Sequence, residues 1–581
     1  MQPHRCIIFI LCLSMTCALP SQGTAEIEQY VLNQLSSFQG TRPTIMQSSL
    51  RNWHNCGICE VVVYLVRTLF ARGHAEDFIV RALKVSCSFF KVESRAVCNG
   101  IIPRFKDMLF VVIQQSSLCG HDFCSLAFPG LCGAPTSAVN WTTPASGRPK
   151  PPIKPVPLPS KSAPRLRVLH LADTHVDAAY TPGSLVNCAD PLCCRKNSTP
   201  HRGWFTVSKA AGFWGSYLSC DIPERTLIAA LKYISETVKP DLVYYTGDII
   251  PHDVWETTVE GNLEQFQRTL DLLTTYLPGV KVIPAIGNHE SNPVNSFPIS
   301  GIKGNFSVKW LYDALANVWS HYIPEDDLEQ FRRGGYFSHQ VSPRLRIISL
   351  NMNYCNTYNW WMLINSTDPT GQLEWLTKQL QECEDEGILV HILGHIPPGQ
   401  IDCFWVLSRN FNDILNRYEA TVTGQFYGHT HLDEFAVAFD KTNKTRAIGV
   451  NFVAPSITTY NAGGPTFRVY SIDGIYGNST YQVLDYETYA MDLDLANQNP
   501  RESYTPTWGV IRSIKELFKM DSLQPAEWAK LVRRLRDDES AFKVFFSMYT
   551  KRLPHAKYTS QDRRRILCRL ITTRSGTPCY L

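Results

Sequence analysis

Two histidines separated by a single residue, His429 and His431, stand directly after an apolar run of the chain. At the end of a strand or in a tight loop, such side chains project to the same side, so both imidazoles could reach one metal ion or two adjacent ions. His-x-His pairs also occur by chance on surfaces and in cores, so this pair alone is weak support for a site. A metal site needs further ligands from elsewhere in the chain.

Four more polar clusters occur upstream of this pair, and each comes directly after a segment with the apolar character of a buried strand. Because the carboxyl ends of strands in an α/β sheet face one crevice, residues about 260 positions apart can meet there. Glycines in the clusters allow the tight turns and close backbone approach that a buried ion site needs. The four clusters are Asp173-Thr174-His175, Gly247-Asp248, Gly287-Asn288-His289-Glu290 and Gly394-His395.

Together, the five clusters hold the ligand types of a binuclear metal site. They offer nitrogen and oxygen donors without a thiolate, and one carboxylate can bridge two cations. Two divalent ions roughly 3.5 to 4 Å apart can hold a hydroxide, bind phosphoryl oxygens and spread the charge that develops in an in-line displacement. The clusters therefore predict a binuclear metal site. The predicted ligands are Asp173, His175, Asp248, Asn288, His395, His429 and His431.

The order Asp-x-His, Gly-Asp, Gly-Asn-His-Glu, Gly-His and Gly-His-x-His resembles the motifs of the calcineurin-like metallophosphoesterases. The resemblance implies that Asp248 bridges the two metals and that metal-bound hydroxide is the nucleophile. On the same resemblance, one metal takes Asp173, His175, Asp248 and His431, and the other takes Asp248, Asn288, His395 and His429.

A leaving alkoxide also needs a proton donor. His289, next to the predicted ligand Asn288, matches the general-acid histidine of this family. His252, four residues after Asp248, is a second candidate that could contact the phosphate or protonate the leaving group. The alternative for His252 is a satisfied residue of the core.

The segments between the clusters alternate between strand and helix patterns, which predicts an α/β core. A chain of 581 residues is too long for one core, and its hydrophobic and charged fractions of 44% and 19% are those of a folded soluble protein. With the family resemblance, we expect a metallophosphoesterase domain over residues 166–490, built as a β-sheet sandwich flanked by helices. Predicted strands are 166–171, 241–246, 280–286, 345–350, 388–393 and 425–427, and predicted helices are 224–238, 261–276 and 371–386.

Residues 50–136 carry seven cysteines around apolar residues at helical spacing, which indicates a small domain that depends on disulfides. The pattern resembles a saposin-type domain, a lipid-binding module of four or five helices. A compact packing domain is the alternative. On the resemblance, the disulfides are Cys56–Cys132, Cys59–Cys124 and Cys87–Cys98, while Cys119 departs from the six-cysteine pattern.

The start of the chain, residues 1–25, has the order of a signal peptide, with a basic start, a short apolar core and small residues near Ala18. No later stretch reaches about 18 uninterrupted apolar residues, so we expect no transmembrane segment. Eight prolines between residues 144 and 164 predict a semi-rigid linker over 140–165 that would let one domain swing against the next.

The C-terminal part, residues 491–581, reads as a helical basic domain, with periodic apolar residues that include Trp508, Ile511 and Ile514. Residues 501–581 contain 17 Lys/Arg against 8 Asp/Glu, a net charge of +9. Such a region favours an anionic membrane surface or nucleic acid, and in a secreted protein the membrane is the better expectation. A solvated helical face is the alternative.

The segments between the motifs, such as 188–194 and 394–399, resemble the acid sphingomyelinase family, as does the order of the domains. The resemblance implies cleavage of sphingomyelin to ceramide and phosphocholine by a monomer with two zinc ions, in lysosomes or outside the cell, and no nucleic-acid partner. It also implies the disulfides Cys188–Cys193, Cys194–Cys220 and Cys355–Cys403.

Six Asn-x-Ser/Thr sequons predict glycosylation if the chain enters the secretory pathway. They begin at Asn140, Asn197, Asn305, Asn365, Asn443 and Asn478. Two other functions stay open. One is hydrolysis of nucleotides or other soluble phosphodiesters with the same metals, and the other is lipid binding without catalysis.

Overall fold

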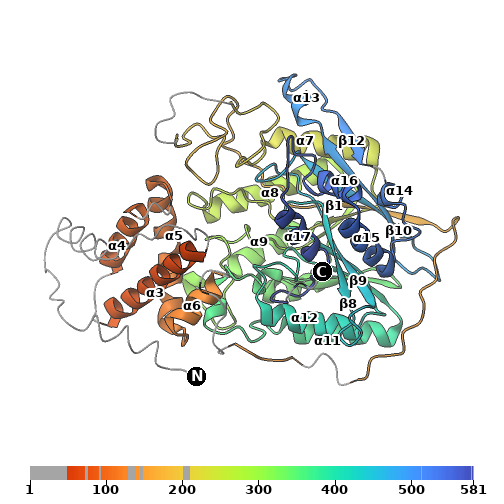
Figure 1. The fold of residues 1–581 in the computed structure, drawn as a ribbon, viewed down its shortest axis with the longest axis horizontal. Helices are drawn as coiled ribbons and strands as arrows, with labels where there is room; N and C mark the ends of the chain where they lie inside the picture. The colour runs from red at the N-terminus through yellow and green to blue at the C-terminus, as the bar shows by residue number, and fades with distance from the viewer. Residues whose placement is uncertain are drawn as a thin grey trace.

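The computed structural model describes residues 49–71, 76–89, 93–128, 132, 139–143, 148–200, 210–511, 513–577 and 579. The predicted signal peptide, residues 1–25, lies outside these ranges. Figure 1 shows a helical N-terminal unit, in red and orange, beside a larger core of sheets and helices. Within the described ranges, no helix has both the length and the apolar character needed to cross a membrane.

The first of two six-stranded sheets begins the core and has the strand order β12-β11-β10-β1-β2-β3. Strands β1, β2 and β3 run parallel, and β10 to β12 continue the sheet antiparallel from β1. Strands β2 and β3 are almost entirely buried, as expected for parallel strands covered on both faces. The bounds are β1 Arg165–Leu171, β2 Leu242–Tyr245, β3 Lys281–Pro284, β10 Thr466–Asp473, β11 Val483–Met491 and β12 Trp508–Ile511.

The second sheet has the order β4-β5-β6-β7-β9-β8. Strands β5, β6, β7 and β9 are parallel, and β4 and β8 are antiparallel edge strands. The bounds are β4 Phe337–Ser342, β5 Leu345–Ser349, β6 Leu389–Leu393, β7 Val422–Tyr427, β8 Glu434–Phe439 and β9 Ala447–Val453.

Aromatic side chains join the two sheets face to face. Phe426 of β7 lies with its ring centroid 4.9 Å from that of Tyr244 in β2 and 5.0 Å from that of Tyr470 in β10. The His170 ring of β1 packs on the same Phe426, and its Nε2 lies 3.0 Å from the Thr246 hydroxyl. This packing confirms the predicted sandwich of sheets.

Amphipathic helices cover the outer faces of the sandwich. In α8, for example, the Thr258 hydroxyl caps the helix by accepting from the Gly261 amide, and Phe266, Thr269 and Leu273 form the buried stripe. The covering helices are α7 Glu224–Tyr233, α8 Val259–Tyr276, α9 Lys309–Trp319, α10 Glu325–Gly334, α11 Gln372–Glu386 and α12 Trp405–Arg417.

Four helices make up the described part of the N-terminal unit: α3 Ser49–Ala71, α4 Glu76–Phe89, α5 Arg95–Gln115 and α6 Gly120–Ala127. This unit contacts the core through α5 and the residues that follow α5 and α6. The Ser116 hydroxyl donates to the carbonyl of Leu363 at 2.7 Å, and the Phe128 ring meets Trp360 edge to face. Helical, disulfide-linked structure therefore occupies the region where a saposin-like domain is predicted.

Part of the predicted linker is bound to the core. Lys150 Nζ lies 2.7 Å from a carboxylate oxygen of Glu419 and 3.2 Å from one of Asp440. The Arg417 guanidinium donates to the backbone carbonyl of Arg148. The start of the linker is attached as well, because Trp141 Nε1 donates to the Ser366 hydroxyl and the Thr143 amide donates to Oδ1 of Asn410.

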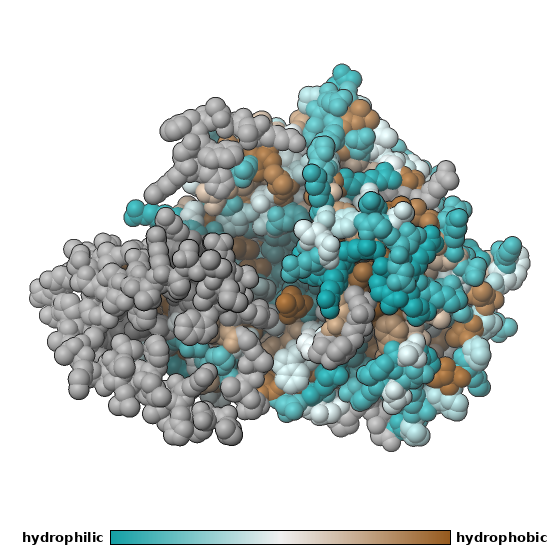
Figure 2. Space-filling model, in the orientation of Figure 1, coloured by the Kyte–Doolittle hydropathy of each residue, from teal (hydrophilic) through white to brown (hydrophobic). Residues whose placement is uncertain are grey.

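The C-terminal region corrects one prediction. Trp508 and Ile511, expected in a helix, form β12 instead, because they pair with Met491 and Thr488 at the edge of the first sheet. The short helix α13, Leu493–Asn497, precedes this strand, and the helical part that follows comprises α14 Ile514–Phe518, α15 Pro525–Asp537, α16 Glu539–Tyr549 and α17 Ser560–Arg569. Figure 2 shows a mostly hydrophilic surface over α15 to α17.

Candidate metal centre

The five polar clusters meet where the parallel strands of both sheets end. The first three follow β1, β2 and β3 of the first sheet, and the last two follow β6 and β7 of the second. Asp173 and Asp248 are held side by side because the amide of Asp173 donates to the carbonyl of Gly247 at 2.9 Å. The site therefore lies at the seam between the sheets rather than at one sheet edge.

Five of the predicted ligands have left-handed backbone conformations. Their φ angles are 52° at Asp173, 37° at His175, 60° at Asp248, 73° at His429 and 59° at His431. Such angles are uncommon for residues other than glycine and cost of order 1 kcal/mol each or more. The surrounding fold stabilises these strained turns, and the turns direct the five side chains toward one another.

Asp248 lies between the two halves of the site. Its Oδ2 atom is 3.3 Å from Nε2 of His175 and 3.2 Å from Nε2 of His395. The neighbouring Asp173 also faces a histidine of the site, because its Oδ1 atom lies 3.5 Å from Nε2 of His431. One carboxylate oxygen thus faces histidines of both predicted metal positions, which is the geometry that a bridging ligand requires.

Backbone carbonyls orient three of the histidines. Because a carbonyl oxygen only accepts, each of these rings carries its proton on Nδ1 and directs Nε2 toward the carboxylates. The contacts are His175 Nδ1 to Ile250 O at 2.6 Å, His395 Nδ1 to Thr246 O at 2.7 Å and His431 Nδ1 to Tyr460 O at 3.0 Å.

The fourth histidine among the predicted ligands, His429, is oriented by a carboxylate instead. Its Nε2 lies 2.6 Å from Oδ2 of Asp402, while its Nδ1 lies 3.0 Å from Oδ1 of Asn288. The same Asn288 oxygen lies 3.0 Å from Nε2 of His395. His395, His429 and Asn288 therefore direct donor atoms toward one point.

The charges of the site fit divalent cations. Burial disfavours a charged His395, but Asp248 and Asp173 outweigh it and raise the pKa of this imidazole to about 10. Burial also opposes charge on His175, yet Asp248 raises its pKa to about 9. His175 Nε2 is buried and makes no hydrogen bond. This nitrogen is buried, and the carboxylates beside it favour a positive charge. Such an arrangement is expected of a metal ligand.

His289 and His252, the two predicted proton donors, lie beside this ligand set. Their ring centroids are 4.6 Å apart, and the His289 amide donates to Oδ1 of Asp248 at 2.9 Å. Ligand atoms of His175, His252 and His431 all lie within 4.8 Å of one another, so His252 is also placed where a metal ligand could stand.

A buried carboxylate holds His252. Oδ1 of Asp221 lies 2.9 Å from Nδ1 of His252, and Oδ2 accepts from the His252 amide at 2.7 Å. The Tyr460 ring stacks on the imidazole with a centroid distance of 3.7 Å. Burial, together with the nearby His175, lowers the pKa of His252 well below its usual value. The imidazole is thus fixed in orientation, with Nε2 left for the site.

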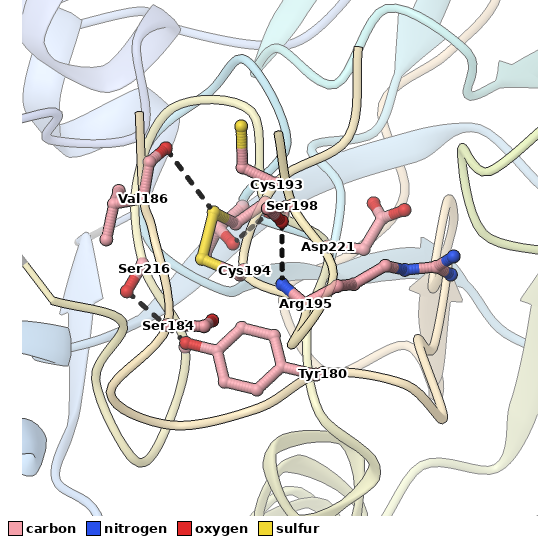
Figure 3. Close-up of a disulfide and its surroundings, with 12 residues drawn as sticks. Tyr180, Ser184, Val186, Cys193, Cys194, Arg195, Ser198, Ser216 and Asp221 are labelled. Atoms are coloured by element: carbon pink, nitrogen blue, oxygen red, sulfur yellow. Dashed lines mark hydrogen bonds between the residues drawn. A yellow bond between two sulfur atoms is a disulfide. The ribbon is translucent and has the colours of Figure 1, made fainter. Parts of the chain in front are cut away.

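A disulfide joins two segments that contact the loop of His252 in space, one at Arg195 and the other at Asp221. Figure 3 shows the Cys194–Cys220 bond with Arg195 and Asp221 beside it. The Arg195 guanidinium lies 2.8 Å from Oδ2 of Asp253, the residue after His252. Burial raises the pKa of the Asp253 carboxyl to about 6, although Arg195 acts in the opposite direction. The loop that carries His252 is therefore held from both sides.

Comparison with known proteins agrees with this geometry. The calcineurin-like phosphoesterase family matches residues 166–433. The chain is similar to a sphingomyelin phosphodiesterase of Bos taurus, with 41% identity over 493 residues that cover 85% of this chain and 78% of that protein. It is also similar to a sphingomyelin phosphodiesterase of Homo sapiens, with 42% identity over 494 residues that cover 85% of this chain and 77% of that protein.

The chain belongs to the sphingomyelin phosphodiesterase family. A more distant relative is a cyclic GMP-AMP phosphodiesterase of Bos taurus, with 30% identity over 402 residues that cover 65% of this chain and 83% of that protein. The resemblance seen in the motifs is thus confirmed at the level of the family.

In this sphingomyelin phosphodiesterase family member, the residues that orient the histidines were missed from the sequence. Asp402 and Asp221 orient His429 and His252, and the carbonyl of Tyr460 orients His431. None stands in a polar cluster after a strand. The one signal for the two aspartates is that each adjoins a cysteine of a predicted disulfide, Cys403 or Cys220.

Among the described residues, the structure contains seven disulfides. They include all six pairs expected from the family resemblances, and the seventh joins Cys568 to Cys579. Cys119 caps α6, and Cys383 is buried in α11 without a disulfide. All six sequon asparagines are exposed. Disulfides in this number are typical of proteins that fold in the secretory pathway.

Proposed function

We propose that this protein hydrolyses sphingomyelin to ceramide and phosphocholine at a binuclear metal site. The position of Asp248 carries the proposal, because one of its oxygens faces His175 and His395 from opposite halves of the ligand set. The similarity to the sphingomyelin phosphodiesterases of Bos taurus and Homo sapiens supports the choice of substrate.

The ligand set suits two zinc ions, since imidazole nitrogens and carboxylate oxygens predominate and no thiolate is present. One position would be held by Asp173, His175, Asp248 and His431, and the other by Asp248, Asn288, His395 and His429. When bound, the two cations would supply Lewis acidity and an activated water for attack on phosphorus. The chain itself fixes the ligands through the strained turns and the backbone acceptors described above.

Proton transfer to the leaving alkoxide falls to the two remaining histidines. His289 follows Asn288, its backbone amide donates to Oδ1 of Asp248, and its ring centroid lies 4.8 Å from that of His175. Its imidazole would therefore adjoin a phosphoryl group bound at the site. His252, oriented by Asp221, would direct Nε2 to the same place and either donate a proton or bind a phosphoryl oxygen. We assign His289 as the general acid and His252 as its partner in this step.

The substrate of this proposal lies in a bilayer, so the enzyme must work at a membrane surface as a peripheral protein. The C-terminal region offers a charge that suits anionic lipids, because Arg533, Arg536, Lys543, Lys557 and Arg564 are all exposed. The N-terminal helical unit, docked on the core through α5, would present lipid to the site. We further propose a glycosylated monomer that is secreted or lysosomal and binds no nucleic acid.

Hydrolysis of sphingomyelin vesicles, measured beside a soluble diester such as bis-nitrophenyl phosphate, tests the proposal. Both substrates should be assayed at acidic and at neutral pH, before and after chelation and with zinc added back. Release of phosphocholine that zinc restores is the expected result. The same assays on Asp248→Asn, which keeps the shape of the ligand but not its charge, provide the matched control.

The other outcomes identify the alternatives. Turnover of the soluble ester alone would indicate a hydrolase of soluble phosphodiesters. The similarity to a cyclic GMP-AMP phosphodiesterase supports that alternative. Binding of vesicles without turnover of either substrate would indicate a lipid-binding protein without catalysis.

A further inference from the structure

One lysine of the basic C-terminal region points inward. Lys551 follows α16 and is only 1% exposed, whereas the arginine after it is exposed. Its Nζ donates to the hydroxyl of Ser456 at 2.6 Å and to the carbonyl of Thr458 at 2.8 Å. Both acceptors lie in the β9–β10 loop, residues 454–465.

The same loop supports the metal centre. The amide of Thr458 donates to the carbonyl of Asp173 at 3.0 Å, and the carbonyl of Tyr460 accepts from Nδ1 of His431 at 3.0 Å. The Thr458 hydroxyl donates to Oδ1 of Asp221 at 2.8 Å. Because Asp221 in turn holds His252, Thr458 connects Lys551 to the His252 ring: its carbonyl accepts from Lys551 and its hydroxyl donates to Asp221.

The position of Lys551 is closely determined. Its φ of 53° is left-handed, and its carbonyl accepts from the Gly464 amide. A Cβ on Gly463 would lie 2.3 Å from that carbonyl oxygen, so only glycine permits the approach of the two segments. Burial lowers the pKa of Lys551 to about 7, against the opposing effect of Asp173 and Asp433. Burying an ammonium group costs free energy, which a purely apolar contact would avoid.

We propose that Lys551 is a positioning residue for His252. It fixes the β9–β10 loop at Ser456 and Thr458, and Thr458 transmits this constraint to the Asp221 carboxylate that orients the imidazole. The inference rests on the proposed function, in which His252 takes part in phosphodiester hydrolysis. It gives the C-terminal helical region a part in the chemistry that is separate from membrane attraction.

A double-mutant cycle between Lys551→Met and His252→Ala tests the proposal, since coupled residues depart from additivity and independent residues do not. The readout is kcat for release of phosphocholine from sphingomyelin by the full chain, because its leaving alkoxide needs a proton and a nitrophenolate does not. Zinc content is measured on each variant. We expect Lys551→Met to lower kcat roughly 10- to 100-fold with both zinc ions retained. In the His252→Ala background, the same substitution should lower kcat less than about 2-fold.

Lys378→Met is the matched control, because this lysine on α11 is 68% exposed and its substitution should leave kcat unchanged. If Lys551→Met fails to fold, Thr458→Val replaces it in the cycle. That variant keeps both acceptors of Lys551 and removes the hydrogen bond to Asp221, so the same coupling with His252→Ala is expected.

Full, multiplicative loss in the double variant, with zinc retained, would overturn the positioning role while leaving the proposed function intact. Unchanged kcat in Lys551→Met or Thr458→Val would overturn it equally. A wild-type enzyme that turns over neither the soluble ester nor sphingomyelin would overturn the proposed function and this inference together.

Discussion

A methyl group at position 287 should disrupt both halves of the metal site at once. A Cβ on Gly287 would lie 2.1 Å from Oδ1 of Asp248, 2.3 Å from the Asp248 amide and 2.7 Å from Oε2 of Glu290. Contacts of a real Cβ essentially never fall below 3.0 Å, so Gly287→Ala requires the Asp248 carboxylate to move by about 0.9 Å. The φ angle of Gly287 is not left-handed, so the effect comes from this clash rather than from backbone strain.

The displaced oxygen belongs to the residue that faces both predicted metal positions. A misplacement of about 1 Å can cost of order 10²-fold in rate, and we expect a loss of that size in kcat for Gly287→Ala. Overpacking should also lower the free energy of unfolding by about 1 to 3 kcal/mol. The measurements are zinc content by elemental analysis, turnover of bis-nitrophenyl phosphate and the thermal midpoint of unfolding.

Gly477→Ala is the control for this experiment. Gly477 is exposed, its φ is ordinary, and a Cβ there would meet nothing within 4 Å. The control should therefore keep both zinc ions and wild-type turnover. Two bound zinc ions and wild-type kcat in Gly287→Ala would refute the placement of Asp248 at the centre of the site.

Three further predictions concern residues around the metals. Asp248→Ala should lose metal and nearly all turnover, whereas His289→Ala should keep both zinc ions and lose roughly 10²- to 10⁴-fold in kcat; equal metal loss in the two variants would argue against their separate roles. Asp402→Asn should weaken zinc binding about 10- to 100-fold, measured by competition with a chelator, because the charge that orients His429 is removed; wild-type zinc affinity would contradict that orienting role. For Asp253, burial raises the folded-state pKa to about 6, so its contribution to stability is full below about pH 4 and is lost as pH rises through about 6. The thermal midpoint of Asp253→Asn should therefore rise relative to that of the wild type as the pH increases from about 4 to 7. A difference between the two midpoints that stays constant across that range would count against the raised pKa.

The strands and the convergence of the polar clusters were accessible from the sequence because their signals are local. A buried parallel strand is a short apolar run, and the residues that follow it, such as Asp173 or His395, must lie at the carboxyl end of the sheet. The ligand types then indicated the chemistry. The cysteine spacing near the N-terminus was likewise informative, since small domains depend on disulfides.

Trp508 illustrates where a local pattern fails. Its spacing from Ile511 and Ile514 fits a helix, but the open edge of β11 offers backbone hydrogen bonds to residues 508–511, and pairing there decides the conformation. Four residues are too few for periodicity to distinguish a strand from the first turn of a helix.

The partners that orient the ligands depend on contacts between distant parts of the chain. Asp402 reaches His429 across 27 residues, Asp221 reaches His252 across 31, and Lys551 reaches Thr458 across 93. An aspartate in a loop, or a lysine in a basic helical tail, has the composition of an exposed residue, and nothing local marks it as buried. Local composition and order thus specify the strands and the predicted reacting groups. Only the packing of the two sheets and the C-terminal helices decides which groups hold each imidazole.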